Sequence, residues 1–293
     1  MEELCPPERL LEDATRFGRH PAFPDAVKVY CVALARLREA PRFLNALIAT
    51  DVRWRIMGYL LYLESDRDRF GPHGGATYGR LLEICTRRAE ASPRELKTLL
   101  GLLKIGFLVR VVRDERDRRI GYYQHTGRLD AFVEQWLGYA VAALDLLEPE
   151  MRRSRFVDDP AFVTRFHVSG GRAHLAGTVP LADRVPRPMS SMKSMLGSYA
   201  VIAGIMEAEL HDRPSPPVAS LSRRFGLSRA QVRNVLAAGQ QLDVFTLDEA
   251  GAVRATPALR NSFARWISIE LAFYARHMRA PGEPVGPVRD ELA

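Results

Sequence analysis

The chain has little cysteine and no long apolar run. Its three cysteines, Cys5, Cys31 and Cys85, are odd in number and far apart in 293 residues, which excludes a disulfide framework and favours a reducing compartment. Charged residues interrupt every apolar stretch well before the ~18 residues that a membrane-spanning helix needs. The start of the chain, 1–7, lacks the basic and apolar regions of a secretory signal. We therefore expect a cytoplasmic protein with no membrane partner.

The motifs of the common enzyme classes are also missing. The sequence contains no GxxxxGK[ST], GxSxG, HExxH or dinucleotide-binding fingerprint. Its seven histidines are scattered, none pairs with another at metal-binding spacing, and there is no CxxC. We therefore expect neither an enzyme nor a cofactor or metal.

The composition is that of a globular protein with a basic excess. Apolar residues make up 47% and charged residues 26%, and the length suits about two domains of ~100–200 residues. Lys and Arg number 42 against 35 Asp and Glu, a net charge of +7, and only four of the 42 are lysines. The arginine excess has two explanations that stay open: the codon usage of a GC-rich genome, or a polyanionic partner such as nucleic acid.

Hydrophobic periodicity predicts two copies of one order of elements, offset by about 130–140 residues. Each copy reads helix, loop, helix, turn, helix, hairpin, long helix. The predicted segments are a flexible arm (1–22), a first domain with flanking helices (23–147), a connector with one short helix near 162–166 (148–192), a second domain (193–279) and a disordered tail (280–293).

Start signals and apolar faces locate the elements of the first copy. They predict helices over 23–40, 43–48 and 52–64, the last capped by Asp51, a short helix after Thr77, and a helix opened by Ser92-Pro93-Arg94-Glu95. A hairpin with strands 107–113 and 120–125 and a long helix over 129–147 follow.

The second copy is predicted as helices over 193–210, 218–225 and 228–238, a hairpin with strands 243–247 and 252–255, and a long helix over 259–278.

The sharpest motif is the stretch 221–236 in the second copy. Ser222 is small where two helices would cross, Gly226 suits the left-handed turn, and Ser228 can cap the second helix. This pattern resembles the helix-turn-helix of bacterial transcription regulators. The register leaves four polar side chains on the outside that could contact base edges or phosphates: Arg229, Gln231, Arg233 and Asn234. An ordinary helical hairpin with a solvated face is the alternative.

The first copy has a looser turn, between Arg87 and Ser92, without the glycine. Its second helix exposes Arg94, Lys97 and Thr98, and its hairpin carries five arginines, including Arg113, Arg116 and Arg118. A hairpin after the second helix is the wing of a winged helix, and the region resembles the MarR-like regulators. The resemblance implies that the second helix enters the major groove and that a basic wing touches the backbone or the minor groove. Three acids, Asp114, Glu115 and Asp117, weaken this analogy, and a solvated charged turn is the alternative. The second hairpin is short and acidic.

We therefore expect a mainly α protein with small β-hairpin wings, in which long helices join two winged-helix domains in tandem. The expected function is sequence-specific binding of double-stranded DNA in transcription control, in the cytoplasm at the nucleoid. A replication initiator or partition factor, or a protein-interaction scaffold without DNA binding, are the alternatives.

The long helices carry aromatic faces that favour an intramolecular pseudo-dimer, with a homodimer as the alternative. A small-molecule effector is a further open question. The aromatic residues that could line its pocket, or simply pack in the core, are Trp136, Tyr139, Trp266, Phe273 and Tyr274. A redox role for Cys85 is conceivable, but a plain core cysteine is the better interpretation.

Overall fold

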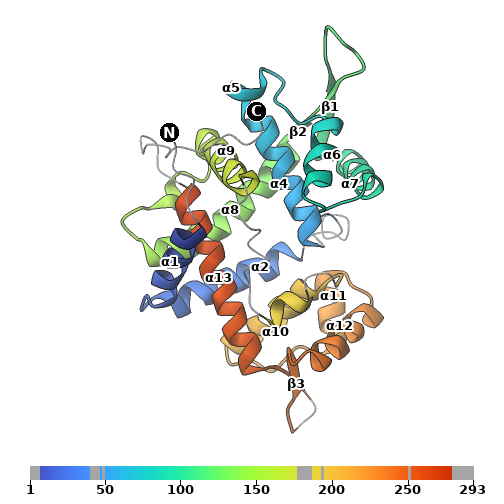
Figure 1. Cartoon of the computed structure of the whole chain (residues 1–293). Coiled ribbons are helices and arrows are strands. Elements are labelled where there is room, and N and C mark those ends of the chain that lie inside the picture. Colours follow the sequence, from blue (N-terminus) through green and yellow to red (C-terminus); the bar gives the residue numbers. More distant parts are fainter. Residues whose placement is uncertain are drawn as a thin grey trace.

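The protein is mainly helical, with two small antiparallel hairpins, as the sequence predicts (Figure 1). The computed structural model describes residues 7–39, 47, 50–176, 187–192, 195–249 and 252–278. Its main helices are α1 (Pro7–Gly18), α2 (Phe23–Leu37), α4 (Asp51–Ser65), α5 (Arg67–Phe70), α6 (Tyr78–Arg87), α7 (Pro93–Ile105), α8 (Gly127–Leu147), α9 (Pro160–Leu175), α10 (Ser198–Leu210), α11 (Val218–Phe225), α12 (Arg229–Gln241) and α13 (Pro257–His277). The strands are β1 (Val109–Arg113), β2 (Gly121–His125), β3 (Phe245–Leu247) and β4 (Val253–Ala255).

Side-chain caps fix where several helices begin. Thr77 caps α6, as predicted, by accepting a hydrogen bond from the backbone N–H of Arg80 over 3.3 Å. The cap of α4 is Thr50 and not Asp51, so that prediction is wrong by one residue, because the Thr50 hydroxyl accepts from the N–H of Arg53. Of the predicted helix over 43–48, all but residue 47 lies outside the described part, as does the predicted tail 280–293.

The element order α4–α6–α7–β1–β2–α8, here the first unit, recurs as α10–α11–α12–β3–β4–α13, here the second unit. The same hydrogen bonds close both hairpins. The hydroxyl of Thr126 donates to the carbonyl of Phe107 over 2.6 Å, and that of Thr256 donates to the carbonyl of Asp243 over 2.7 Å. Phe107 and Asp243 both adopt a left-handed backbone, with φ of 54° and 55°.

A glutamate holds the end of the second strand in each unit. Glu64 of α4 accepts from the backbone N–H of His125 over 3.1 Å, and Glu209 of α10 accepts from that of Ala255 over 2.5 Å. Both acceptors lie at the end of the first helix of their unit. The two units therefore share these hydrogen bonds as well as their order of elements.

Each unit is completed by a helix that precedes the other unit in the chain. Helix α2 precedes α4, yet it packs on α10 of the second unit as well as on α8. Helix α9 precedes α10, yet it packs on α4 of the first unit and on α13. The approach of α2 to α10 is close, because the Cys31 thiol lies 3.6 Å from the carbonyl of Ala203. This reciprocal packing places one continuous core between the units.

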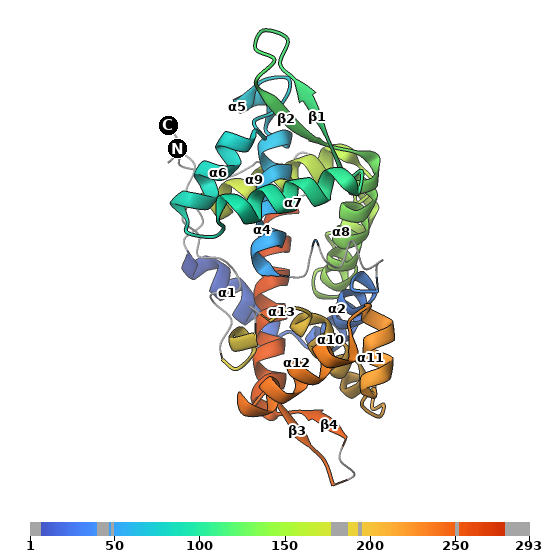
Figure 2. The same cartoon turned by 90° about the vertical axis from the view of Figure 1, so that its right-hand side faces the viewer.

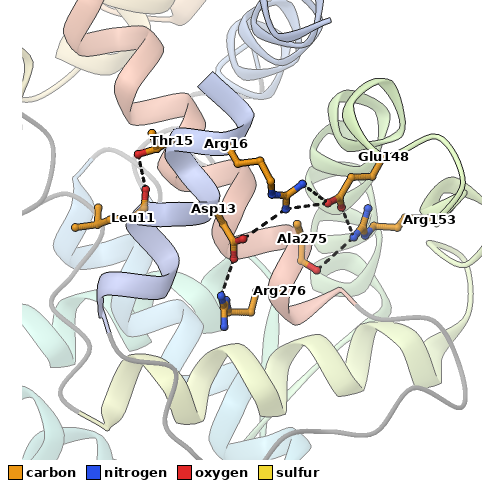
Figure 3. Close-up of polar contacts among 8 residues, drawn as sticks. All are labelled: Leu11, Asp13, Thr15, Arg16, Glu148, Arg153, Ala275 and Arg276. Carbon is orange, nitrogen blue, oxygen red and sulfur yellow. Dashed lines mark hydrogen bonds and ion pairs between the residues drawn. The ribbon is translucent and has the colours of Figure 1, made fainter. Parts of the chain in front are cut away.

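The prediction of a flexible arm over 1–22 is wrong for the residues that the structure describes. Helix α1 packs along α13 and buries Leu10, Ala14 and Phe17, which recur at the i, i+4, i+7 spacing of one helix face. Its polar side also holds it in place, as Figure 3 shows. The polar contacts join Asp13 to Arg276 over 2.6 Å and Arg16 to Glu148 over 3.1 Å.

The described part of the connector, 148–176 and 187–192, is more helical than predicted. In place of a short helix near 162–166, α9 has sixteen residues, begins after the cap Asp159 and includes Gly170 and Gly171. Glycine disfavours a helix interior, which is why the sequence suggests a break there. In the structure Gly171 lies against Tyr62 of α4, where even a Cβ atom would meet the tyrosine Cβ at 2.4 Å. Tertiary packing therefore overrides the local propensity.

Candidate nucleic-acid interface

Helices α11 and α12 are joined by the turn that the sequence motif predicts. Gly226 has φ of 64°, the left-handed conformation that glycine adopts without strain. The Ser222 hydroxyl donates to the carbonyl of Leu227 over 2.7 Å, so this serine closes the turn and is more than a small residue at a crossing. Val232 and Leu236 are buried, which fixes the outer face of α12.

Three of the predicted DNA-contacting residues of α12 are exposed: Arg229, Arg233 and Asn234. Ser228 is the N-cap and accepts from the backbone N–H of Gln231 over 3.1 Å. Gln231 is half-buried, and its side-chain oxygen accepts from the N–H of Ser228 over 2.8 Å. The structure therefore uses Gln231 to complete the capping box, a role that the sequence analysis did not assign.

Helices α6 and α7 have the same turn without the glycine. Ala89 takes the left-handed conformation, with φ of 51°, and the N–H of Glu90 donates to the carbonyl of Cys85 over 3.0 Å. The equivalent bond in the second unit runs from Leu227 to Ser222 over 3.1 Å. The turn that looked looser in sequence therefore has the same closing hydrogen bond.

The first turn of α7 matches that of α12. Ser92 accepts from the N–H of Glu95 over 3.2 Å, and Glu95 accepts from the N–H of Ser92 over 2.8 Å. The predicted contact residues Arg94, Lys97 and Thr98 are all exposed on α7. Two of them also have local contacts, since Thr98 donates to the carbonyl of Arg94 and the Lys97 ammonium lies 5.7 Å from the centroid of the Tyr78 ring.

Asp114 organises the turn of the first hairpin. Asp114 accepts from the backbone N–H groups of Arg116 and Asp117 over 2.8 and 2.9 Å. Both bonds lower the pKa of the Asp114 carboxyl, and the bond from the Asp117 N–H has the larger effect. Within the described part of the chain, Arg116 and Arg118 are exposed and form no ion pair. Arg113 instead folds back on the hairpin, where it donates to the carbonyls of Arg118 and Arg119 over 3.4 and 3.5 Å.

The second hairpin differs in length and charge. Its strands have three residues each, and Arg254 forms an ion pair with Asp248 over 3.1 Å. The side chain of Arg254 is therefore held by its own hairpin.

The two helix pairs lie on the same side of the molecule. In Figure 1, α6 and α7 lie above α11 and α12 along the right-hand edge, and in Figure 2 both α7 and α12 face the viewer. The hairpins β1–β2 and β3–β4 project from opposite ends of this face (Figure 2). The exposed residues of α7 and α12 can therefore approach one extended surface together.

Between the units lies a pocket of about 190 Å³. Of the aromatic residues predicted to line an effector pocket or pack in the core, Trp136, Trp266, Phe273 and Tyr274 line it and Tyr139 does not. Glu270, which was not among the predicted pocket residues, lines the same pocket and is four residues from Trp266 on α13. That spacing, one turn of a helix, was the available signal.

Cys85 and Cys31 are buried free thiols. Burial, and secondarily the charge of Glu90, raises the pKa of Cys85 to about 11, so the thiol stays protonated. This favours the core interpretation of Cys85. The described residues include no group of three or more side chains that could hold a metal ion, and no helix among them is long and apolar enough to cross a membrane.

Comparisons of the chain with protein-family models, with curated proteins and with solved structures find no match, so the geometry of these helices and hairpins is what bears on its function.

Proposed function

We propose that the protein binds double-stranded DNA sequence-specifically and regulates transcription at the nucleoid, using two winged helices in one chain. The observation that carries the proposal is the match between α7 and α12. Both begin with a serine capping box, both follow a left-handed turn, and both carry exposed basic and polar residues. The two helices lie on the same side of the molecule (Figure 2). Arginine, lysine and asparagine are the side chains that contact phosphates and base edges.

In this proposal each unit is a winged helix similar to those of MarR-like regulators. Helices α7 and α12 are the recognition helices, and β1–β2 and β3–β4 are the wings. Arg94, Lys97 and Thr98 contact DNA from the first unit, and Ser228, Arg229, Arg233 and Asn234 from the second. Gln231 caps α12 with its side-chain oxygen and contacts DNA only through its side-chain NH2 group.

The first wing is the stronger candidate for contact with the DNA backbone. Two of its three acids, Asp114 and Asp117, accept backbone hydrogen bonds within the turn, whereas Arg116 and Arg118 are exposed. In the second wing Asp248 holds Arg254. We therefore assign phosphate contacts to the first wing and none to the second.

The reciprocal packing of α2 and α9 supports an intramolecular pseudo-dimer. In that arrangement one chain presents two recognition helices that a homodimer would take from two copies. Because the exposed residues of α7 and α12 differ, the DNA site has two unlike halves.

Selection of bound sequences from a pool of random duplex DNA tests the proposal. We expect enrichment of one bipartite sequence whose halves differ. Enrichment of several iterated copies of a short repeat would favour a replication initiator instead. Binding without enrichment would contradict the sequence specificity of the proposal, and no binding at low salt would contradict the proposal as a whole and favour the protein-interaction scaffold.

A further inference from the structure

The pocket between the units has the size of a one-ring ligand. Helices α2, α4, α8, α9, α10 and α13 contribute to its walls, and its volume is about 190 Å³. An apolar protein cavity of ~150 Å³ is large enough to bind benzene. The pocket therefore has room for an aromatic ring with a small substituent.

Aromatic side chains from both units line the pocket in equivalent places. Trp54 lies ten residues before Glu64, and Tyr199 lies ten residues before Glu209, the glutamates that hold the strand ends. Trp136 lies ten residues after Thr126, and Trp266 lies ten residues after Thr256, the threonines that close the hairpins. The Trp54 and Trp136 ring centroids are 4.6 Å apart, and those of Tyr199 and Trp266 are 5.7 Å apart. All three tryptophans of the chain line this pocket.

One residue breaks this equivalence. Glu270 lines the pocket from α13, whereas the corresponding residue of α8 is Ala140. The Glu270 carboxylate accepts hydrogen bonds from Tyr274 over 3.0 Å and from Tyr30 over 3.5 Å. Burial, with the charge of Glu270 as a further cause, raises the pKa of both tyrosines, so both stay neutral donors. The aromatic wall therefore includes a carboxylate that two hydroxyl groups hold in place.

Among the described residues of the wall, Arg55 and Arg38 have partners and the His167 ring carries no charge. The Nε of Arg55 lies 3.3 Å from a carboxylate oxygen of Glu90, and Arg38 is engaged within the fold. Burial, with a smaller contribution from the charge of His125, lowers the pKa of His167 to about 3, so its ring is neutral. The ring of His174 packs on that of Tyr59, with centroids 5.6 Å apart.

We propose that this pocket binds a small hydrophobic organic cation that joins one aromatic ring to a quaternary ammonium group. The faces of tryptophan and tyrosine rings attract such cations through their quadrupoles, most strongly where water is excluded. Glu270 supplies the opposite charge, and the volume limits the ligand to about one ring. The proposal concerns ligand binding alone and does not depend on the DNA-binding function.

Quenching of tryptophan fluorescence tests it directly in the full-length protein, because every tryptophan lines the pocket. The probes are benzyltrimethylammonium, its uncharged isostere neopentylbenzene, and phenylacetate. We expect saturable quenching by the cation, confirmed by calorimetry, with an affinity roughly ten-fold or more above that of the isostere. No saturation by about 1 mM cation, equal affinity for the isostere, or a preference for phenylacetate would overturn the proposal.

Glu270→Gln separates the charge from the shape of the pocket, because the amide oxygen can still accept from Tyr274. It is expected to weaken binding of the cation roughly ten-fold and leave the isostere within about two-fold. Glu134→Gln, at an exposed glutamate of α8, is the matched control for net charge. Equal affinities in the two variants would contradict the role of Glu270. If Glu270→Gln does not fold, Trp266→Leu provides the second test, and it should weaken the cation more than the isostere.

Discussion

Ser228 and Gln231 hold each other at the start of α12. The Ser228 N–H donates to the Gln231 side chain over 2.8 Å, and the Gln231 N–H donates to the Ser228 hydroxyl over 3.1 Å. Arg229, between them in sequence, is exposed. Of these two candidates for DNA contact, Gln231 therefore also stabilises the helix and Arg229 does not. Substitutions can separate the effect on stability from the effect on DNA binding.

Replacing Arg229 with Ala should cost ~1–3 kcal/mol of binding free energy on the selected site. We expect a much smaller change on unrelated duplexes and an unchanged midpoint of urea unfolding, because the side chain is exposed. Gln241→Ala, at the exposed end of α12, is the control. Equal loss on every duplex, measured by fluorescence anisotropy, would make Arg229 a phosphate contact.

Replacing Gln231 with Ala should lower the free energy of unfolding by about 0.5–1.5 kcal/mol, because the Ser228 N–H loses its partner. Gln231→Glu retains an acceptor, as Glu95 does in α7, and should keep the stability while its negative charge weakens binding to DNA. Urea unfolding and anisotropy on the same preparations check both. Unchanged stability in Gln231→Ala would show that the capping box contributes little.

Replacing Arg116 and Arg118 together with Ala should reduce the slope of log affinity against log salt by up to roughly two phosphate equivalents. The turn should persist, because Asp114 is held by backbone N–H groups, including that of Arg116, and these remain after the substitutions. Arg152 and Arg155, also exposed, give a control pair of the same charge. An identical slope in the wild type and in the Arg116/Arg118 variant would show that the first wing does not contact the DNA backbone.

Changing the spacer between the two halves of the proposed DNA site tests the proposed pseudo-dimer. Recognition helices that are held by one core meet the duplex about one helical turn, near 10 base pairs, apart. Inserting about five base pairs should place one half on the far side and abolish most of the affinity, and about ten should partly restore it. If footprinting shows an affinity that does not depend on the spacer, only one helix recognises the DNA sequence, and α12 is the candidate.

Replacing Gly171 with Ala should destabilise the protein by about 1–3 kcal/mol, because the new Cβ would meet Tyr62 at 2.4 Å. The matched change Gly138→Ala, in α8, meets nothing within 4 Å and should stabilise the protein by about 0.5–1 kcal/mol through helix propensity. Thermal unfolding compares the two variants. Equal changes in thermal stability in the two variants would show that α9 and α4 can move apart without a loss of stability.

Local signals in the sequence predicted many of the element boundaries. Ser92-Pro93 and Ser228 mark the starts of α7 and α12, and Gly226 marks the turn between α11 and α12. Both hairpins and both long helices lie where the pattern placed them, within about two residues. These features depend on caps, glycine conformations and apolar spacing, all of which act within a few residues.

The same local signals could not show how distant segments meet. The connector looked irregular because Gly170 and Gly171 disfavour a helix, yet α9 needs Gly171 to reach Tyr62. Helix α1 looked like a loose arm because its apolar face acquires a partner only when α13, some 250 residues later, is in place. The left-handed conformation of Ala89 was not predicted, because glycine is the residue type that indicates this conformation in a sequence.

Signals that act along the chain therefore predict most of the helices, both hairpins, and the exposure of Arg229, Arg233 and Asn234 on α12. Three features appear only once the chain is folded: α2 and α9 each pack on the other unit, α7 and α12 lie on one side, and three tryptophans and Glu270 line one pocket. The two kinds of feature differ in the distance along the chain over which they act. Capping and periodicity are set by neighbours along the chain, whereas the pairing of apolar faces depends on which buried surfaces fit together at large sequence separation.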